Sequence, residues 1–222
     1  LEVTTRMKAK YQKGRQSVWQ YLRMTSIVNP HAEITFTDPD GEVHHWPRVT
    51  ERLPGKVESI KPHPHGIELG QLQRMLSEST DSRISVFMRT NFSGVSTRAA
   101  KELCAAAELD VKVKPKQMSP DQIRALLEAF QGERLFNGKP VKLLNPPTNC
   151  LSPIEEMLIK KGLSKTIDSR YATTMTRAPN VSQGNPYQVE VGLIFGGDMA
   201  ADKPVEVLRF ANRVPLMYHQ GY

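Results

Sequence analysis

The clearest helical pattern in the chain lies in residues 87–109. Small apolar residues recur there at the spacing of one buried helix face: Ala99, Ala100, Leu103, Cys104 and Ala107. A polar turn over residues 91–96 comes first, with Gly94 where the backbone turns sharply. Ser93 or Ser96 can accept a hydrogen bond from the first amides of the helix. The pattern predicts a capped amphipathic helix after this turn.

Further helices are predicted by apolar spacing and by capping residues. Residues 67–79 keep helical spacing, and a capping box with Ser17 and Gln20 opens a helix near the start of the chain. A second capping box, Ser119 with Gln122, opens a helix that ends at Gly132. Residues 152–161 predict one more helix, which ends at Gly162.

Strand patterns occupy both flanks of this helical region. Residues 32–37 and 43–46 alternate around the turn sequence DPDG and predict a hairpin at the edge of a larger sheet. Residues 1–7 are consistent with the end of a strand. Further strands are expected at residues 171–176, 187–195, 205–210 and 214–218. In residues 187–195, the apolar residues at odd positions predict a half-buried strand face.

Two breaks rich in proline divide the chain, KPHPHG at residues 61–66 and NPP at residues 145–147. The order is therefore strands, then helices, then a helix and strands, which indicates an α+β fold class with three parts. The chain begins at Leu1 rather than Met and ends at Tyr222 without a stop signal. We expect it to be the middle of a longer protein.

The charge balance favours a polyanionic partner. The 222 residues carry 30 Lys plus Arg against 23 Asp plus Glu, a net charge of +7. Residues 1–25 alone hold six basic residues and one acidic residue. The loop KGRQ at residues 13–16 precedes a predicted helix, which suits contact with phosphates. A solvated charged loop is the alternative.

Other classes of site find little support in the residues. Two cysteines, Cys104 and Cys150, make neither a disulfide framework nor a metal knuckle, so a reducing, cytoplasmic setting is expected. His44 and His45 point to opposite strand faces, and we expect no metal site. The chain has no long apolar run and no leader sequence, so no membrane association is expected. No catalytic residue is predicted, because no nucleophile, metalloprotease or P-loop motif occurs.

Several separated strings together resemble the B-subunit family of archaeal type IIB DNA topoisomerases (topoisomerase VI). The strings are KGRQ at 13–16, SIVNPHAEI at 26–34, DPDG at 38–41, KPHPHG at 61–66, LSPIE at 151–155, GNPYQVEV at 184–191 and LRFANRVPL at 208–216. They follow the order of the family over nearly the whole chain, which makes the resemblance far more specific than a single short motif.

The resemblance implies a domain organisation. Residues 1–62 would be the C-terminal part of a Bergerat-type (GHKL) ATPase domain, residues 63–148 a helix–two-turns–helix domain, and residues 149–222 the first part of an α/β transducer domain. It also implies an ATP-dependent isomerase. ATP would close two B subunits into a dimer, and the transducers would pass this motion to two A subunits that cut DNA, in an A2B2 heterotetramer. The outcome would be relaxation and decatenation of DNA.

The resemblance places ATP and Mg²⁺ in the full-length protein, on motifs outside this chain. We therefore assign no nucleotide ligand to any residue, and expect the chain alone to be inactive. Contact with double-stranded DNA is implied for the loop of Lys13, Gly14, Arg15 and Gln16. Many family members have arginine where this chain has Gln16, so one phosphate contact is expected to be weaker.

By analogy with other helix–two-turns–helix proteins, the turn is a second candidate DNA contact, through Asn91, Gly94, Ser96, Arg98 and Lys101. Two alternatives stay open. One is a stand-alone nucleic-acid-binding module of the helix–two-turns–helix type, against which the sheet-like flanks argue. The other is a different Bergerat-fold ATPase, against which the helical insert argues.

Overall fold

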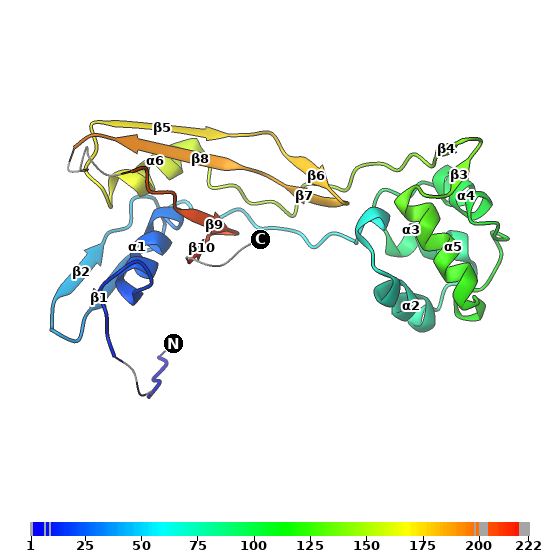
Figure 1. The fold of residues 1–222 in the computed structure, drawn as a ribbon, viewed down its shortest axis with the longest axis horizontal. Helices are drawn as coiled ribbons and strands as arrows, with labels where there is room; N and C mark the ends of the chain where they lie inside the picture. Colours follow the sequence, from blue (N-terminus) through cyan, green and yellow to red (C-terminus); the bar gives the residue numbers. More distant parts are fainter. Residues whose placement is uncertain (1, 7, 9, 198, 200–203, 218–222) are drawn as a thin grey trace. The chain divides into compact units, whose positions relative to one another are not determined.

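A computed structural model describes residues 2–6, 8, 10–197, 199 and 204–217 (Figure 1). This part of the chain mixes helices with antiparallel strand pairs, which confirms the predicted α+β class. It divides into two compact units. The first comprises Leu1–Gly55, Pro153–Arg177 and Val189–Tyr222, and the second comprises Lys56–Ser152 and Ala178–Gln188. Each unit contains its own cluster of buried apolar side chains.

In the first unit, helix α1 (Val18–Val28) begins at Ser17, whose hydroxyl accepts from the backbone N–H of Gln20. Only this half of the predicted capping box is seen. The backbone N–H of Ser17 donates instead to the carbonyl of Gly14, at 3.1 Å. The strand end predicted over residues 1–7 is not formed by residues 2–6, and Leu1 and Met7 lie outside the described residues.

Strands β1 (Ile34–Thr37) and β2 (Val43–Trp46) form the predicted hairpin, with Ile34 opposite Trp46. Its turn is fixed by a carboxylate. Oδ1 of Asp38 accepts from the backbone N–H groups of Asp40 and Glu42, at 3.0 and 2.9 Å. Gly41 takes the left-handed conformation that this turn requires, with φ of +84°. The larger sheet expected around the hairpin stays a prediction, since the described strands give β1 and β2 only each other as partners.

Helix α6 (Glu156–Ser164) packs on α1 and completes the buried cluster of the first unit, which consists of Ile27, Val28, Ile154, Ile159 and Leu163. The prediction of this helix over residues 152–161 is wrong at both ends. Its start is delayed because the amides of Ile154 and Glu155 donate to the carboxylate of Glu190, at 2.7 and 2.8 Å. The helix then continues through Gly162, where the absence of a side chain lets α6 approach the Ile27 carbonyl.

Strands β5 (Tyr171–Thr176) and β8 (Glu190–Phe195) pair antiparallel, with Tyr171 opposite Phe195. The strand predicted over residues 171–176 is confirmed. The predicted buried face of residues 187–195 is wrong, because Tyr187, Val189, Val191, Leu193 and Phe195 are between 42 and 70% exposed. The opposite face carries the packing, since Ile194 contacts the cluster around α6.

Strands β9 (Arg209–Ala211) and β10 (Val214–Leu216) form a last pair in this unit. The strand predicted over residues 205–210 is formed only at its end, because residues 204–208 are not in a strand. The strand predicted over residues 214–218 is confirmed as far as Leu216. Tyr218 lies outside the described residues.

The second unit is mainly helical. Its elements are 3₁₀ helix η1 (Pro64–Gly66), α2 (Leu69–Glu78), α3 (Ile84–Asn91), α4 (Thr97–Ala106), η2 (Pro115–Gln117) and α5 (Pro120–Gln131). The predicted helices over residues 67–79 and 119–132 correspond to α2 and α5. The capping box of Ser119 and Gln122 is complete, and Gly132 ends α5 in the left-handed conformation.

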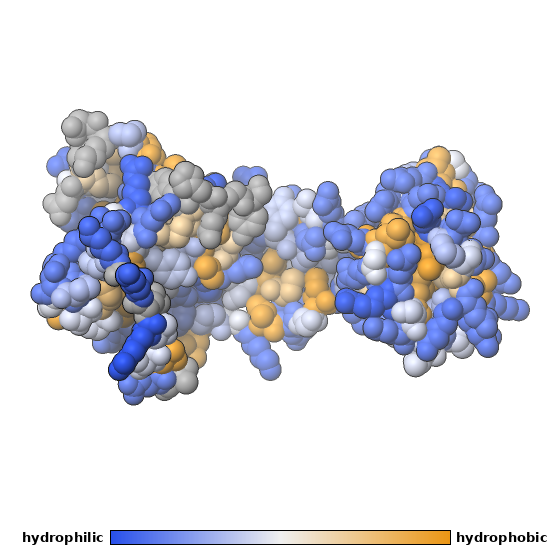
Figure 2. Space-filling model, turned by 60° about the horizontal axis from the view of Figure 1, so that its bottom comes forward, coloured by the Kyte–Doolittle hydropathy of each residue, from blue (hydrophilic) through white to orange (hydrophobic). Residues whose placement is uncertain are grey.

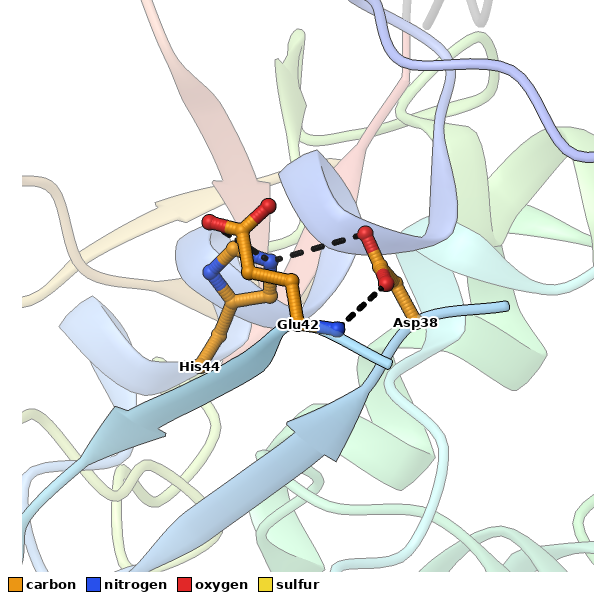
Figure 3. A group of neighbouring side chains, drawn as sticks. All are labelled: Asp38, Glu42 and His44. Carbon is orange, nitrogen blue, oxygen red and sulfur yellow. Dashed lines mark hydrogen bonds and ion pairs between the residues drawn. The ribbon is translucent and has the colours of Figure 1, made fainter. Parts of the chain in front are cut away.

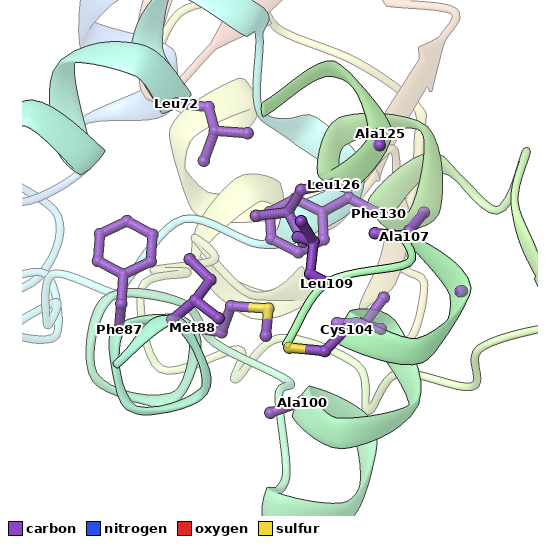
Figure 4. Close-up of a cluster of buried hydrophobic side chains, with 14 of the residues drawn as sticks. Leu72, Phe87, Met88, Ala100, Cys104, Ala107, Leu109, Ala125, Leu126 and Phe130 are labelled. Atoms are coloured by element: carbon purple, nitrogen blue, oxygen red, sulfur yellow. The ribbon is translucent and has the colours of Figure 1, made fainter. Parts of the chain in front are cut away.

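Helices α2 to α5 enclose the core of the second unit (Figure 4). The side chains of Leu72, Phe87, Leu126 and Phe130 are fully buried there. Burial of each such side chain stabilises the unit by about 1.5–3 kcal/mol. The predicted helix face of residues 99–107 points into this core, and all five of its residues are buried.

Two short hairpins complete the second unit. Strands β3 (Leu135–Phe136) and β4 (Lys139–Pro140) are joined by Asn137 and Gly138, both with positive φ. Strands β6 (Asn180–Ser182) and β7 (Asn185–Tyr187) form a hairpin that was not predicted, and β7 takes up Tyr187, so the strand predicted over residues 187–195 is formed only from Glu190 as β8. Tight left-handed turns at Gln183 and Gly184 turn this segment into a hairpin.

The face of the molecule in Figure 2 is predominantly hydrophilic among the described residues, with scattered apolar patches. Among those residues, no helix is both long and apolar enough to cross a membrane.

Candidate nucleic-acid interface

The basic loop of residues 13–16 lies directly before α1 in the first unit. Its lysine does not extend freely into solvent. Nζ of Lys13 lies 3.2 Å from Oδ2 of Asp38 and 3.0 Å from Oε2 of Glu42. The side chain of Asp38 is fully buried, whereas those of Lys13 and Glu42 are more than half exposed. The loop is thus joined by ion pairs to the turn of the β1–β2 hairpin.

These contacts shift the pKa values of both partners. Hydrogen bonds to Glu42 and then to Asp38 raise the pKa of Lys13 above its ordinary value. Burial acts to raise the pKa of the Asp38 carboxyl, but the Glu42 amide and the Lys13 ammonium outweigh it and hold that pKa below its ordinary value. Lys13 and Asp38 are therefore a charged pair at neutral pH.

The hairpin turn also brings together three side chains of the types that ligate metals, a grouping that was not predicted from the sequence. Asp38, Glu42 and His44 bring one ligand atom each within 4.8 Å of one another (Figure 3). Nε2 of His44 lies 4.0 Å from the Asp38 carboxylate and 3.8 Å from that of Glu42. The ammonium of Lys13 already supplies a positive charge to both carboxylates. The cluster is therefore accounted for as an ion-pair network.

The second candidate contact, the turn before α4, belongs to the second unit. Asn91 is committed there to structure, since its Nδ2 donates to Asp81 and to the Phe87 carbonyl, each at 3.0 Å. Gly94 has φ of +75°, and a side chain at this position would collide with the Leu144 carbonyl and the His63 ring. Ser96 caps α4, because its hydroxyl accepts from the Ala99 amide at 3.1 Å.

The two basic candidates on α4 differ in their partners. Nε of Arg98 donates to Glu102 at 2.7 Å, and this pair raises the pKa of Arg98. Lys101 is exposed, and no ion pair involves it among the described residues. Of the five candidates near this turn, Asn91, Gly94 and Ser96 hold the local structure. Arg98 and Lys101 remain at the surface.

Two further cationic residues of this region, Lys61 and Arg89, were not predicted from the sequence. Together with Thr90, Ser96 and Thr97 they line a hollow beside the start of α4. Lys61 belongs to the proline-rich segment before η1, and Arg89 to the last turn of α3. Neither residue belongs to a recognisable motif, and the two line the same hollow only in the folded chain. The α3 helix itself was not predicted as a separate element.

Comparisons with known proteins identify relatives of the chain. Residues 146–222 match a family model described as the transducer of the topoisomerase VI B subunit. The B subunit of type 2 DNA topoisomerase 6 from Methanococcoides burtonii is 46% identical over 99% of this chain. The corresponding proteins of Methanosarcina acetivorans and Metallosphaera sedula are 45% and 33% identical, over 99% and 95% of this chain.

The match covers 34% of the two methanogen proteins and 38% of the one from Metallosphaera sedula, so the chain spans about a third of the length of these curated relatives. The alignments with these relatives extend over 95–99% of this chain. By sequence, the chain is similar to topoisomerase VI B subunits over nearly all of its own length, and it matches about a third of theirs.

Proposed function

We propose that the chain is part of the B subunit of an ATP-dependent type IIB DNA topoisomerase. In this role it helps to couple ATP-driven closure of two B subunits to double-strand breakage and DNA passage by the A subunit. The observation that carries the proposal is the 46% identity over 99% of the chain to a protein named as this subunit. None of the relatives reported above is a stand-alone nucleic-acid-binding module.

The partners follow from the same assignment. They are double-stranded DNA, the A subunit, and a second B subunit in an A2B2 heterotetramer. ATP and Mg²⁺ are the cofactors of the whole enzyme. We assign no residue of this chain to the nucleotide, because no glycine-rich phosphate loop occurs in its sequence.

The proposed domains are a C-terminal part of a GHKL ATPase domain over 1–62, a helix–two-turns–helix domain over 63–148, and the first part of a transducer over 149–222. Two observations support this division. The buried cluster of α2 to α5 is separate from that of α1 and α6. The transducer match begins at residue 146. The compact units depart from this division, since Leu1–Gly55 shares one unit with Pro153–Arg177 and Val189–Tyr222, while residues 56–62, 149–152 and 178–188 group with the helices.

DNA contact is proposed at two places, the loop of Lys13 to Gln16 and the turn and helix start from Asn91 to Lys101. The first is supported by its position before a helix and by an excess of basic residues in the first 25 positions. The second is supported by a turn that ends in the Ser96 cap of α4, and by the exposed cations of α4.

The overall proposal is tested in the complete complex of the full-length protein that carries this chain with its A-type partner. We expect relaxation of supercoiled plasmid and decatenation that require ATP, Mg²⁺ and both proteins. Omission of either protein, or of ATP, is the control. Relaxation without ATP, or no change in topology with all components present, would contradict the proposal.

The loop is tested by a Lys13→Ala, Arg15→Ala double variant. We expect weaker duplex binding and a smaller dependence of the binding constant on salt, because phosphate contacts release counterions. A Lys160→Ala, Lys161→Ala variant removes the same charge from exposed positions on α6. An unchanged salt slope in the first variant, or equal changes in both, would reject a specific role of the loop.

A further inference from the structure

Two sequence strings that are distant along the chain, KPHPHG at 61–66 and GNPYQVEV at 184–191, meet in the second unit. The first contains η1, and the second begins in the turn of the β6–β7 hairpin. A Cβ added to Gly66 of η1 would lie 2.5 Å from the carbonyl oxygen of Gln183 in that turn. The two backbones are therefore in direct contact, and the tip of the hairpin is docked on η1.

The tip of this hairpin depends on such a support. Each of its strands is three residues long, and neither pairs with any other strand of the described residues. A bond from the amide of Arg177 to the carbonyl of Val189, at 2.9 Å, closes the base of the hairpin. An isolated two-stranded hairpin is at best marginally stable in water. The contact with η1 is therefore what holds the tip in place.

The side chain of His63 lies between this hairpin and the turn before α4. A Cβ added to Gly184 would lie 2.7 Å from the Cβ of His63 and 2.9 Å from its Nδ1. At the other end of the ring, a Cβ added to Gly94 would lie 2.8 Å from Nε2. Both glycines have positive φ, and His63 is only 6% exposed. One buried ring therefore contacts the backbone of the hairpin and that of the turn.

Hydrogen bonds fix the orientation of this ring. Its Nδ1 accepts from the amide of His65 at 3.2 Å, and its Nε2 lies 3.0 Å from the carbonyl of Leu144. With Nδ1 as the acceptor, Nε2 carries the proton and donates to that carbonyl. The amide of Leu144 donates in turn to the carbonyl of Gly94 at 3.0 Å. The ring cannot turn aside without the loss of these bonds.

We propose that His63 is a positioning residue that couples the β6–β7 hairpin to the turn before α4. The hairpin lies within the residues that match the transducer, and the chain continues from it into β5 and β8. Because the ring contacts backbone at both ends, a shift of the hairpin either displaces the turn or breaks the contact. The inference rests on the proposed function and adds the residue through which a movement of the transducer reaches the helices.

Hydrogen exchange of residues 180–188 in the full-length protein tests the docking in the absence of ATP and DNA. We expect His63→Ala to raise the exchange rate of this peptide about ten-fold, since an unsupported hairpin opens readily. His63→Gln keeps an N–H donor for the Leu144 carbonyl and should stay within about two-fold of the wild type. Exchange in α5 reports whether the helical core remains folded.

Gly66→Ala tests the same contact without a change at His63. Its Cβ would collide with the Gln183 carbonyl, and Gly66 is not in the left-handed conformation, so the new contact is the main perturbation. Gly70→Ala is the matched control, because a Cβ there meets no atom within 4 Å. Unchanged exchange of the hairpin in both His63→Ala and Gly66→Ala would overturn the proposal. Equal loss of protection in the hairpin and in α5 would also overturn it, since His63 would then only stabilise the core.

The coupling is tested in the complete complex with the A-type partner, by the relaxation rate relative to the rate of ATP hydrolysis. We expect His63→Ala and Gly66→Ala to slow relaxation about five-fold while ATP hydrolysis stays within about two-fold of the wild type. His63→Gln should restore relaxation. A residue that only stabilises the fold would lower both rates together.

Normal relaxation by variants with a loosened hairpin would overturn the positioning role and leave the proposed function intact. Absence of ATP-dependent relaxation by the wild-type complex would instead contradict the proposed function, and with it the coupling. The exchange experiment needs neither ATP nor DNA, so it still decides whether His63 holds the hairpin.

Discussion

The ammonium of Lys13 lies 3.2 Å from the carboxylate of Asp38, and that carboxylate is fully buried under the hairpin turn. The basic loop therefore has a structural partner as well as a proposed external one. The carboxylate of Glu42, which is exposed to solvent, also lies 3.0 Å from this ammonium. A phosphate that binds Lys13 must compete with both carboxylates, since one ammonium has only three N–H donors.

Removal of the exposed competitor should strengthen DNA binding. Glu42→Gln leaves Asp38 in place and removes one of the two negative charges that pair with the ammonium of Lys13. We expect about three-fold tighter duplex binding at low salt and a slightly steeper salt dependence, because surface charges act over about 10 Å. The measurement is anisotropy with a labelled duplex.

Glu51→Gln is the matched control for this variant, because it removes the same charge from an exposed residue that pairs with Arg48 at 2.9 Å. Its effect should stay below that of Glu42→Gln. Weaker DNA binding by Glu42→Gln would indicate that Lys13 serves only to anchor the loop to the hairpin.

The sequence predicted elements well where the signal was local. Ser119, Gln122 and Gly132 determine the ends of α5 by their own hydrogen bonds and backbone conformation, and the structure confirms them. The start of α6 depends instead on Glu190, which is distant in sequence and holds the amides of Ile154 and Glu155. No pattern within residues 152–155 contains this information.

Two other differences have distinct causes. Asn137 followed by Gly138 is the strongest short hairpin signal, so β3 and β4 were within reach of sequence reasoning. The odd-numbered residues of 187–195 have the alternation of a buried face, yet they are exposed among the described residues. Alternation shows which residues share a face of a strand, and it does not show which face is covered.

The candidate site could be predicted only in part. Ser96 was identified as a cap from its position before an apolar helix, and it performs that role. Lys61 and Arg89 could not be found, because they are separated by 27 other residues and lie together only through the turn at Gly94. The ion pair of Lys13 with Asp38 was likewise invisible in the sequence.

His63 should make the second unit sensitive to acid. It is 6% exposed, its Nε2 lies 3.0 Å from the Leu144 carbonyl, and its Nδ1 accepts from the His65 amide at 3.2 Å. These partners require a neutral ring with the proton on Nε2. Burial lowers the pKa of His63, with a smaller opposing effect from the Leu144 carbonyl and a further lowering by His65.

Because the native pKa is below the ordinary value of about 6.5, the unfolded state binds the proton more readily. Stability is therefore complete above about pH 6.5 and falls as the pH drops toward the native pKa, by at most about 1.4 kcal/mol per pH unit. Thermal unfolding between pH 5 and 8 measures this dependence. His63→Gln should flatten it, and His65→Gln should flatten it less, because only the smaller effect of His65 on the pKa of His63 is lost. Equal slopes in all three proteins would exclude His63 as the cause.

The two cysteines should differ in reactivity. Cys104 lies in the core at 0% exposure, and burial, with a minor contribution from Asp110, raises the pKa of its thiol to about 11. Cys150 is partly exposed. At pH 8 a thiol reagent should label only Cys150 in the native protein and both cysteines in denaturant. Mass spectrometry of the labelled peptides distinguishes the two. Rapid native labelling of Cys104 would contradict the burial of α4.

The close contact of α6 with α1 should make Gly162 intolerant of a side chain. A Cβ at this position would collide with the Ile27 carbonyl, and backbone cannot yield as a flexible side chain can. We expect Gly162→Ala to destabilise the first unit by about 1–3 kcal/mol, the usual cost of overpacking. Hydrogen exchange at Ile27 and Val28, both buried in that cluster, reports this loss directly.

Gly70→Ala is the comparison, since a Cβ there meets no atom within 4 Å and the residue lies in the first turn of α2. Alanine is the better helix former by up to about 1 kcal/mol, so this variant should be neutral or slightly more stable. If Gly162→Ala also stabilised the protein, helix propensity would outweigh the contact. The approach of α6 to the Ile27 carbonyl would then not be the reason that a glycine stands inside this helix.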